Sequence, residues 1–272
     1  MDKETREIFK RGSKTYFNSS LFFPIDVRED VFKLYSFVRT ADDFVDSVPQ
    51  RANEFYSFKE KFFSSLEKGY STDKIINNYL EVAKKRNFDN NWAIAFLKSM
   101  EMDIVKKNYD TLNETLEYIY GSAEVIGFFM AKILALPDES LYYAGMLGRS
   151  MQYINFIRDI DEDNKLGRRY LPLNNGLTNL FYNETRNKRE EFISFIRGQI
   201  ELYYKWLREA EQGFKFIPFR MLIPIKTASD MYKWTAKKIY KDPFIVYRKK
   251  VKPSKIRIVL KILENFLSRG LI

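Results

Sequence analysis

Apolar residues recur at three- and four-residue intervals along most of the chain, which is the spacing of one face of an α-helix. This pattern predicts helices over residues 31–48, 91–105, 115–136, 141–160, 191–207 and 254–266. Alternating strand patterns are scarce, and no Asn-Gly or Asp-Gly pair separates two β-rich runs. We therefore predict an all-α fold.

Prolines and glycines between the periodic segments mark where the predicted helices end. They are Pro49, Gly69, Pro137, Pro172, Gly176, Pro218, Pro224, Pro243 and Pro253. The chain shows no internal repeat, no low-complexity linker and no sharp change in composition. Its 272 residues, 45% of them hydrophobic, are enough to bury a sizeable core. We expect a single domain, residues 1–272, built from roughly eight to ten helices.

The composition excludes several kinds of chemistry. The chain has no cysteine, which removes disulfides, zinc–thiolate sites, iron–sulfur clusters and thiol nucleophiles. It also has no histidine, the usual acid–base residue and the commonest transition-metal ligand. A bound metal would therefore be held by oxygen ligands, which favours Mg²⁺, Mn²⁺ or Ca²⁺.

The net charge of +10 indicates an anionic partner, such as nucleic acid, a phosphorylated substrate or an anionic membrane, or else reflects a Lys-rich genome composition. The N-terminal stretch MDKETREIFKRGSK is charged and is no signal peptide. The longest apolar run, VIGFFMAKILALP, is too short to span a bilayer. These features favour a cytoplasmic, soluble chain.

Asp26 and Asp30, in the segment PIDVRED, are one helical turn apart. Asp26 follows Pro24, and Glu29 comes three residues later, which is the arrangement of a capping box at the start of a helix. Acidic residues also suit the first turn, where the helix dipole is positive. The spacing Asp-x-x-x-Asp alone therefore does not indicate a metal site.

Asp42 and Asp46 have the same spacing but lie more than three turns into the helix predicted to begin near Asp26. Like charges at this spacing cost an isolated helix roughly 0.2–0.5 kcal/mol, so the pair needs a compensating role. A second pair, Asp159 and Asp163, lies in QYINFIRDIDEDNKLGRRYLP, residues 152–172.

An arginine precedes each acidic pair: Arg39 lies three residues before Asp42, and Arg158 lies immediately before Asp159. Either pair in isolation could be a solvated acidic face. Two such pairs in apolar helices, in a chain without histidine or cysteine, favour facing carboxylates that hold Mg²⁺ and through it a diphosphate. The two arginines would bind the same diphosphate in forked geometry.

The acidic segments resemble the signature regions of the squalene/phytoene synthase family. Residues 13–46 are similar to its Ser-rich opening motif, its Tyr-x-x-x-Arg and its first Asp-rich motif. Residues 152–172 are similar to Gln-x-x-Asn-x-x-Arg-Asp-x-x-x-Asp followed by Arg-x-Tyr-Leu-Pro. Residues 100–134 resemble the central helices, with Ser122 and Glu124 departing from the commoner Val-Ala-Gly version. The motifs follow one another in order and cover most of the chain.

The resemblance implies an isoprenoid-synthase-type helical bundle with a central apolar cavity, and it assigns roles to individual residues. The implied metal ligands are Asp42, Asp46, Asn155, Asp159 and Asp163. The implied prenyl diphosphate-binding residues are Ser13, Lys14, Thr15, Tyr35, Arg39, Gln152, Arg158, Arg168, Tyr170, Tyr232 and Lys249. Arg168 and Tyr170 are expected on a flap after the second motif. A histidine found in the opening motif of some family members is Gly12 here.

The resemblance also implies a reaction. Family members ionise one prenyl diphosphate to an allylic cation while magnesium and arginines take up charge on the leaving diphosphate. A second prenyl chain attacks to give a cyclopropylcarbinyl diphosphate, whose ionisation and rearrangement join the chains 1–1′. Aromatic side chains such as Phe128 and Phe129 suit a cavity that shields cations from water, although aromatic stripes also form ordinary core.

The product and cofactor follow from the branch of the family. Squalene synthase-type members add a hydride from NADPH and commonly end in a membrane helix. This chain has no Gly-x-Gly-x-x-Gly fingerprint and ends ILENFLSRGLI. We therefore expect Mg²⁺, with Mn²⁺ as an alternative and without NADPH, and phytoene from two geranylgeranyl diphosphates in preference to dehydrosqualene from two farnesyl diphosphates.

Other interpretations are a class I terpene cyclase or hydrolase acting on one prenyl diphosphate, a non-catalytic scaffold relative, and a basic nucleic-acid-binding protein. The presence of all four aspartates argues against a scaffold. The acidic motifs and the core spacing of the aromatics argue against nucleic acid as a partner. A hydrocarbon product implies peripheral contact with a membrane, yet the sequence shows no dedicated amphipathic anchor. The sequence does not indicate an oligomeric state.

Overall fold

The structure, a computed structural model, describes residues 23–174 and 176–268. In chain order the elements are α3 (Ile25–Asp46), α4 (Ala52–Lys68), α5 (Lys74–Arg86), α6 (Asn90–Val105), α7 (Leu112–Ile119), the π-helical turn η2 (Tyr120–Glu124), α8 (Val125–Ile133), α9 (Ser140–Arg158), α10 (Ile160–Lys165), α11 (Tyr182–Asn187), α12 (Arg189–Glu211), the 3₁₀ turn η3 (Gln212–Phe216), α13 (Phe219–Lys241), α14 (Ile245–Arg248) and α15 (Lys255–Leu267). Within these residues the only β pairing is an isolated bridge between Asn108 and Arg169. The predicted all-α class is confirmed.

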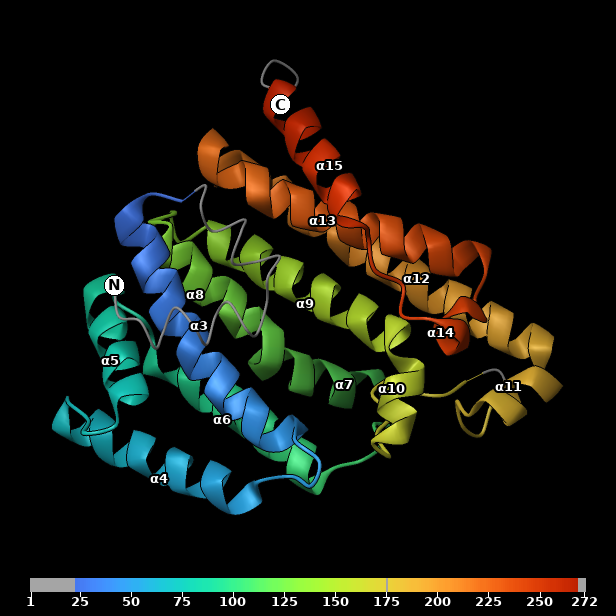
Figure 1. Cartoon of the computed structure of the whole chain (residues 1–272), viewed down its shortest axis with the longest axis horizontal. Helices are drawn as coiled ribbons and strands as arrows, with labels where there is room; N and C mark the ends of the chain where they lie inside the picture. The colour runs from blue at the N-terminus through green and yellow to red at the C-terminus, as the bar shows by residue number, and fades with distance from the viewer. Residues whose placement is uncertain (1–22, 175, 269–272) are drawn as a thin grey trace.

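One hydrophobic cluster is built by α3, α4, α5 and α6 together with α8 (Figure 1). Phe37 of α3 is fully buried at its centre, with its ring centroid 4.4 Å from that of Tyr79 and 5.3 Å from that of Phe62. Offset and tilted ring pairs of this kind add to the free energy of burial. The cluster therefore holds α3 against α4, α5 and α6 and fixes the helix that carries the first acidic pair.

A second hydrophobic cluster is centred on α9 and α12, which pack along much of their length. Tyr153 and Trp206 meet edge to face, with ring centroids 4.9 Å apart. Helix α13 runs beside both helices on the same side of the molecule (Figure 1). This cluster fixes α9, the helix that leads into the second acidic segment.

The two clusters meet where η2 and α8 cross α9, and small residues allow the backbones to approach closely there. A Cβ atom added to Gly148 of α9 would lie 2.2 Å from the carbonyl oxygen of Ala123, and one added to Gly127 of α8 would lie 2.2 Å from that of Ala144. Only glycine fits at such contacts, because no side-chain movement relieves a clash with backbone. The spacing of α9 from η2 is thus set by main-chain atoms.

The predicted helix over residues 115–136 is three successive pieces rather than one. Between α7 and α8 the chain makes a π turn, in which the Val125 N–H donates to the Tyr120 carbonyl five residues back. Such single turns occur frequently at functional sites. Periodicity did not reveal the turn, because the apolar positions on either side continue without a visible break.

Two expectations about helix boundaries are wrong. Pro224 was expected between helices but lies inside α13, in its second turn, where it removes one backbone hydrogen bond of the helix. The short helices α10, α11 and α14 raise the helix number above the eight to ten expected, since their few residues carry too little pattern to be seen.

The expected capping box at Asp26 is also wrong, because α3 begins at Ile25 and has no side-chain cap. The conclusion that this acidic pair is structural nevertheless holds. Asp30 is buried and accepts from Arg86 Nε at 2.6 Å and Lys85 Nζ at 3.0 Å, and Asp26 lies 3.3 Å from Arg86. The pair anchors α3 to α5.

Within residues 23–174 and 176–268, none of the helices combines the length and the apolar character that crossing a bilayer requires.

The glycine contact makes the first prediction. Gly148→Ala should lower the free energy of unfolding by about 1–3 kcal/mol, because α9 must move away from the Ala123 carbonyl. Gly198→Ala in α12 is the matched control: nothing lies within 4 Å of the added Cβ, so the protein should gain up to about 1 kcal/mol. Urea denaturation of both variants measures the difference. Equal effects of the two substitutions would contradict the close approach.

Candidate active site

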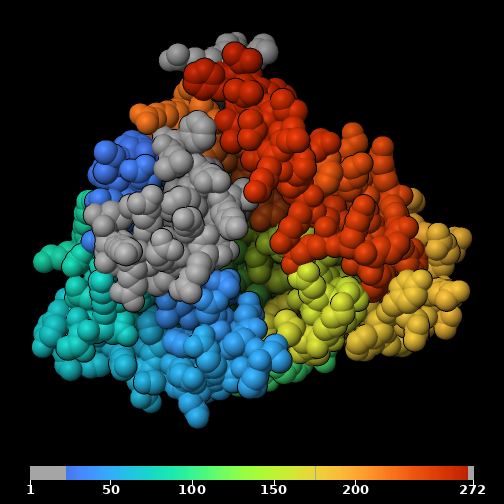
Figure 2. All heavy atoms as spheres, in the orientation of Figure 1, coloured from blue at the N-terminus to red at the C-terminus, as the bar shows by residue number. Residues whose placement is uncertain are grey.

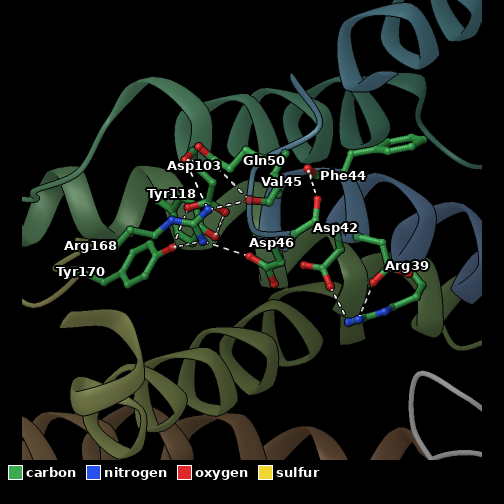
Figure 3. Close-up of polar contacts among 12 residues, drawn as sticks. Arg39, Asp42, Phe44, Val45, Asp46, Gln50, Asp103, Tyr118, Arg168 and Tyr170 are labelled. Carbon is green, nitrogen blue, oxygen red and sulfur yellow. Dashed lines mark hydrogen bonds and ion pairs between the residues drawn. The ribbon is translucent and has the colours of Figure 1, made fainter. Parts of the chain in front are cut away.

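The first acidic pair lies along the C-terminal half of α3 (Figure 3). Arg39 bridges two acidic neighbours on its own helix: Nη1 lies 2.7 Å from Asp42 Oδ2, and Nη2 lies 2.5 Å from Asp43 Oδ1. Asp46, one turn further on, ends the helix and is exposed. The expected one-turn spacing of these side chains is therefore present.

The second acidic segment contains a helix break that the sequence pattern did not predict. Helix α9 ends at Arg158, Asp159 caps it with φ −99° and ψ 15°, and Asp163 lies on the separate helix α10. Arg158 grips Asp159 with both Nε (2.8 Å) and Nη2 (2.5 Å). This forked contact holds the carboxylate at the junction of the two helices.

A pocket of about 160 Å³ lies between α3, α6, the α7–η2 segment and α9. Its lining is Tyr35, Val38, Arg39, Asp42, Phe96, Met100, Tyr118, Ser122 and Gln152. Charged and amide groups thus face apolar and aromatic groups across one space. The space-filling view shows a hollow between α3 and the C-terminal segment, bordered by α10 (Figure 2).

Two buried oxygen atoms at the site have no hydrogen-bond partner in the part of the chain that the structure describes. They are Asn155 Oδ1 on α9 and Ser122 Oγ in η2. Buried polar atoms are nearly always satisfied, so an orphan acceptor indicates a group that binds there. Asn155 was predicted as a metal ligand, and its free carbonyl oxygen is of the type that Mg²⁺ prefers.

Arg168 and Tyr170 do not form an exposed flap, which corrects the expectation. Each is only 6% exposed. The Tyr170 ring stacks on Phe156, with centroids 4.3 Å apart and planes 6° apart. Arg168 Nη1 instead donates to Asp46 Oδ1 at 2.9 Å, and Nη2 donates to the Val45 carbonyl at 2.7 Å.

Asp103, at the end of α6, is the centre of a buried polar network that the sequence analysis missed (Figure 3). Its carboxylate accepts from the hydroxyls of Tyr118 and Tyr170, both at 2.6 Å. Its carbonyl oxygen accepts from Gln50 Nε2 at 3.0 Å and more weakly from Arg168 at 3.4 Å. The network joins the ends of α3 and α6 to the segment after α10. A lone aspartate in the apolar stretch MEMDIV was the available signal.

The remaining predicted residues lie in three different situations. Ser13, Lys14 and Thr15 lie outside the described residues. Tyr232 of α13 lies near Arg158, and the pKa of the Arg158 guanidinium is raised. Burial lowers this pKa, but Asp159 and, less strongly, Tyr232 together raise it by more. Lys249 is exposed, and its neighbour Lys250 is the one that reaches the site, 3.3 Å from Asp159. The role expected for Lys249 therefore stays a prediction, and Lys250 is a second basic residue at this position.

The carboxylates of the two acidic pairs affect one another's pKa values. Burial and the neighbouring Asp46 raise the pKa of Asp42 to about 7, against the opposing effect of Arg39. Burial and Asp159 raise the pKa of Asp163 to about 8, and Asp46 from the other pair acts in the same direction. Carboxylates from α3 and α10 therefore repel each other across the site, which a bound cation would relieve.

No three acidic side chains among the described residues converge on one point that could hold a metal ion. The carboxylates are instead paired with bases: Asp42 with Arg39, Asp46 with Arg168, and Asp159 with both Arg158 and Lys250. The chemistry of the donor set still fits magnesium, because it is all oxygen and includes the free Asn155 carbonyl.

Comparison with known proteins decides the family. A sequence model described as squalene/phytoene synthase matches residues 9–257 of this chain. The chain belongs to the squalene/phytoene synthase family. The resemblance read from the motifs is confirmed.

Among curated squalene/phytoene synthase relatives, the chain is similar to the 15-cis-phytoene synthase of Enterobacter agglomerans, with 30% identity over 243 residues covering 84% of this chain and 82% of that protein. It is also similar to the 15-cis-phytoene synthase of Paracoccus sp. (strain N81106 / MBIC 01143), with 26% identity over 262 residues covering 92% and 85%. Both relatives align over most of their length.

Solved structures show the same fold. A dehydrosqualene synthase in complex with ligand superposes with a TM-score of 0.84 at 19% identity, covering 99% of this chain and 96% of that one. Squalene synthase HpnC from Alicyclobacillus acidocaldarius superposes with a TM-score of 0.79 at 19% identity, covering 89% and 94%. The predicted isoprenoid-synthase-type bundle is confirmed. This squalene/phytoene synthase family member is a prenyltransferase, and its family supports head-to-head condensation of prenyl diphosphates.

The raised pKa of Asp163 makes the second prediction. Without divalent cations, Asp163→Asn should raise the melting temperature, since the amide keeps the shape and removes a buried charge that Asp159 and Asp46 repel. The folded-state pKa lies above the unfolded one, so the destabilisation appears as pH rises from about 4 to about 8 and is constant above that. The gain should therefore grow over this range in thermal melts followed by circular dichroism.

Asp161→Asn on the same helix is the control for this prediction. Asp161 is paired with Lys165 at 2.6 Å, so its loss should bring no gain that grows with pH. A stabilisation by Asp163→Asn that is the same at about pH 5 and about pH 8.5 would contradict the electrostatic account.

Proposed function

We propose that this protein is a magnesium-dependent phytoene synthase that joins two geranylgeranyl diphosphates 1–1′ without NADPH. The overall change releases two diphosphates and one proton and leaves a hydrocarbon of doubled carbon number. The choice of phytoene is supported by the curated relatives with 26–30% identity over most of the chain, which are phytoene synthases.

The proposal of a magnesium-dependent site is supported by the electrostatic repulsion between carboxylates of the two acidic pairs. Burial and Asp159 contribute most to the raised pKa of Asp163 on α10, and the Asp46 carboxylate of α3 adds to it although it belongs to the other motif. Asp42, Asp46, Asn155, Asp159 and Asp163 are the residues that would hold magnesium. Bound magnesium would act as a Lewis acid that stabilises the leaving diphosphate.

The basic side chains of the site have a second role. Arg39, Arg158 and Lys250 are ion-paired with aspartates of the two motifs. When cations take over those aspartates, the freed guanidinium and ammonium groups can bind diphosphate oxygens. Gln152 and Tyr35, which line the same pocket, would orient the diphosphate.

The apolar part of the pocket suits the carbocations of this reaction. Phe96, Met100 and Tyr118 face Arg39 and Asp42 across the pocket. Aromatic rings stabilise a desolvated cation by about 2 kcal/mol each and exclude water that would quench it. Glu124, one of the departures from the common central motif, is paired with Arg149 at 2.7 Å and supports the fold beside this wall.

The substrate is tested by incubating the purified protein with labelled geranylgeranyl or farnesyl diphosphate and Mg²⁺, with and without NADPH. We expect a hydrocarbon from geranylgeranyl diphosphate without NADPH. A hydrocarbon formed only from farnesyl diphosphate would replace phytoene by dehydrosqualene or squalene. A single-chain alcohol or terpene as the sole product would overturn head-to-head condensation for this chain.

The roles of the aspartates are tested by substitution. Asp42→Ala and Asp159→Ala should each lower kcat by a factor of about 100 or more, because charge on the leaving diphosphate is no longer balanced. Asp26→Ala is the matched control, since it removes an acid of the same spacing that only anchors α3 to Arg86. Circular dichroism should show an unchanged helical fold in all three. Loss of activity in Asp26→Ala, with activity kept in the other two variants, would contradict the roles assigned to Asp42 and Asp159.

A further inference from the structure

Helix α15 turns its apolar side away from the protein. Six of its apolar side chains are more than half exposed: Ile256, Val259, Leu260, Leu263, Phe266 and Leu267. Each of them lies three or four residues from another member of the set, so they form one continuous stripe along the helix. No dedicated amphipathic anchor was expected from the sequence, because helical spacing does not show which side of a helix is exposed.

The side of α15 that packs on α13 is only partly apolar, because the half-buried Ile258 and Ile262 share it with Asn265. Asn265 is 3% exposed, and its amide donates to Thr227 Oγ1 at 3.1 Å and to Asp230 Oδ2 at 3.0 Å on α13. Its carbonyl oxygen accepts from Lys226 at 3.1 Å. The helix is thus fixed to the protein with most of its apolar side chains left exposed, and a continuous exposed apolar surface marks an interaction site.

The charge of this segment selects the partner. Residues 249–268 carry one acidic residue, Glu264, and a group of basic ones: Lys249, Lys250, Lys252, Lys255, Arg257 and Lys261. Two copies of this surface facing each other would bring these like charges together, which opposes a symmetric dimer. Anionic lipid headgroups attract them, while the apolar stripe enters the acyl region.

We propose that α15 is a docking helix that lies in the surface of an anionic bilayer. The segment that leads into it carries Lys250, which contacts Asp159 of the active site, so the docked helix is adjacent to the site. The C-terminal segment borders the hollow seen in the space-filling view (Figure 2). A prenyltransferase whose substrates are prenyl chains can thus exchange them with lipid without passing them through water.

Vesicle binding tests the proposal without any substrate, so its outcome does not depend on which prenyl diphosphates the enzyme joins. Co-sedimentation uses vesicles of phosphatidylcholine alone and of phosphatidylcholine with phosphatidylglycerol. The protein should bind the anionic vesicles, and added salt should weaken binding. Leu260→Gln with Leu263→Gln should reduce the partition coefficient about tenfold or more.

The matched control is Val105→Gln with Phe181→Gln, which also removes two exposed apolar side chains but lies elsewhere. It should bind as the unchanged protein does. Equal binding of the two double variants would overturn the proposal. So would a dimer in lipid-free solution that Leu260→Gln with Leu263→Gln dissociates, or a marked drop in melting temperature for that variant, since both mean that protein covers the stripe.

A second readout follows the environment of one position in the stripe by fluorescence. The chain has no cysteine, so Leu263→Cys can carry a single environment-sensitive fluorophore. Its emission should shift to the blue on anionic vesicles, whereas the same label at Val105→Cys should not shift. Unshifted emission at position 263 in the presence of saturating vesicles would overturn the docking of α15.

Discussion

The active site is held in place by the buried carboxylate of Asp103. The carboxylate accepts hydrogen bonds from the hydroxyls of Tyr118 and Tyr170. The backbone carbonyl oxygen of Asp103 accepts from Gln50 and Arg168. A buried carboxylate is tolerated only when paired and fully hydrogen-bonded, so every member of the network is needed by the others. Because its partners come from α7, from the segment after α3 and from the segment after α10, the network fixes both acidic motifs relative to each other.

The charges of the site are balanced within the protein. Arg39, Arg168, Arg158 and Lys250 each hold an aspartate of the two motifs. Such a balance lets strongly charged groups face an apolar pocket while the enzyme is free of diphosphate. Under the proposed function, a diphosphate and its cations would exchange partners with these side chains when they bind.

The sequence predicted the features that depend on regular spacing along the chain, namely the long helices and the acidic motifs. The long helices have clear periodicity, and the spacing of Asp42 and Asp46 placed them one turn apart on one helix. The spacing of Asp159 and Asp163 did not reveal that α9 ends between them and Asp163 lies on α10. What it could not predict depends on contacts across the fold. Asp103 is one acid without a motif, and only the buried hydroxyls of Tyr118 and Tyr170 give it a role.

The placement of single side chains depends on the same kind of contact. Lys249 and Lys250 are adjacent, and only the path of the chain after α14 decides that Lys250 contacts Asp159. Arg168 lies in a glycine-containing segment of polar residues that reads as a flexible loop, yet it is drawn inward by Asp46 and the Val45 carbonyl. The apolar stripe of α15 has ordinary helical spacing, and the contacts that leave it exposed, such as the hydrogen bonds of the buried Asn265 amide to α13, cannot be seen in that spacing.

The π turn between α7 and α8 has a consequence for how this pocket can vary. It contains one residue more than an α-helical turn, and side chains advance by about 100° per residue. Ser122 inside the turn lines the pocket, while Gly127 just beyond it meets α9 backbone to backbone. Deleting a single residue here would restore a regular helix and rotate one of these positions away from its neighbour. The wall of the pocket is therefore more sensitive to the length of this segment than to the identity of any side chain in it.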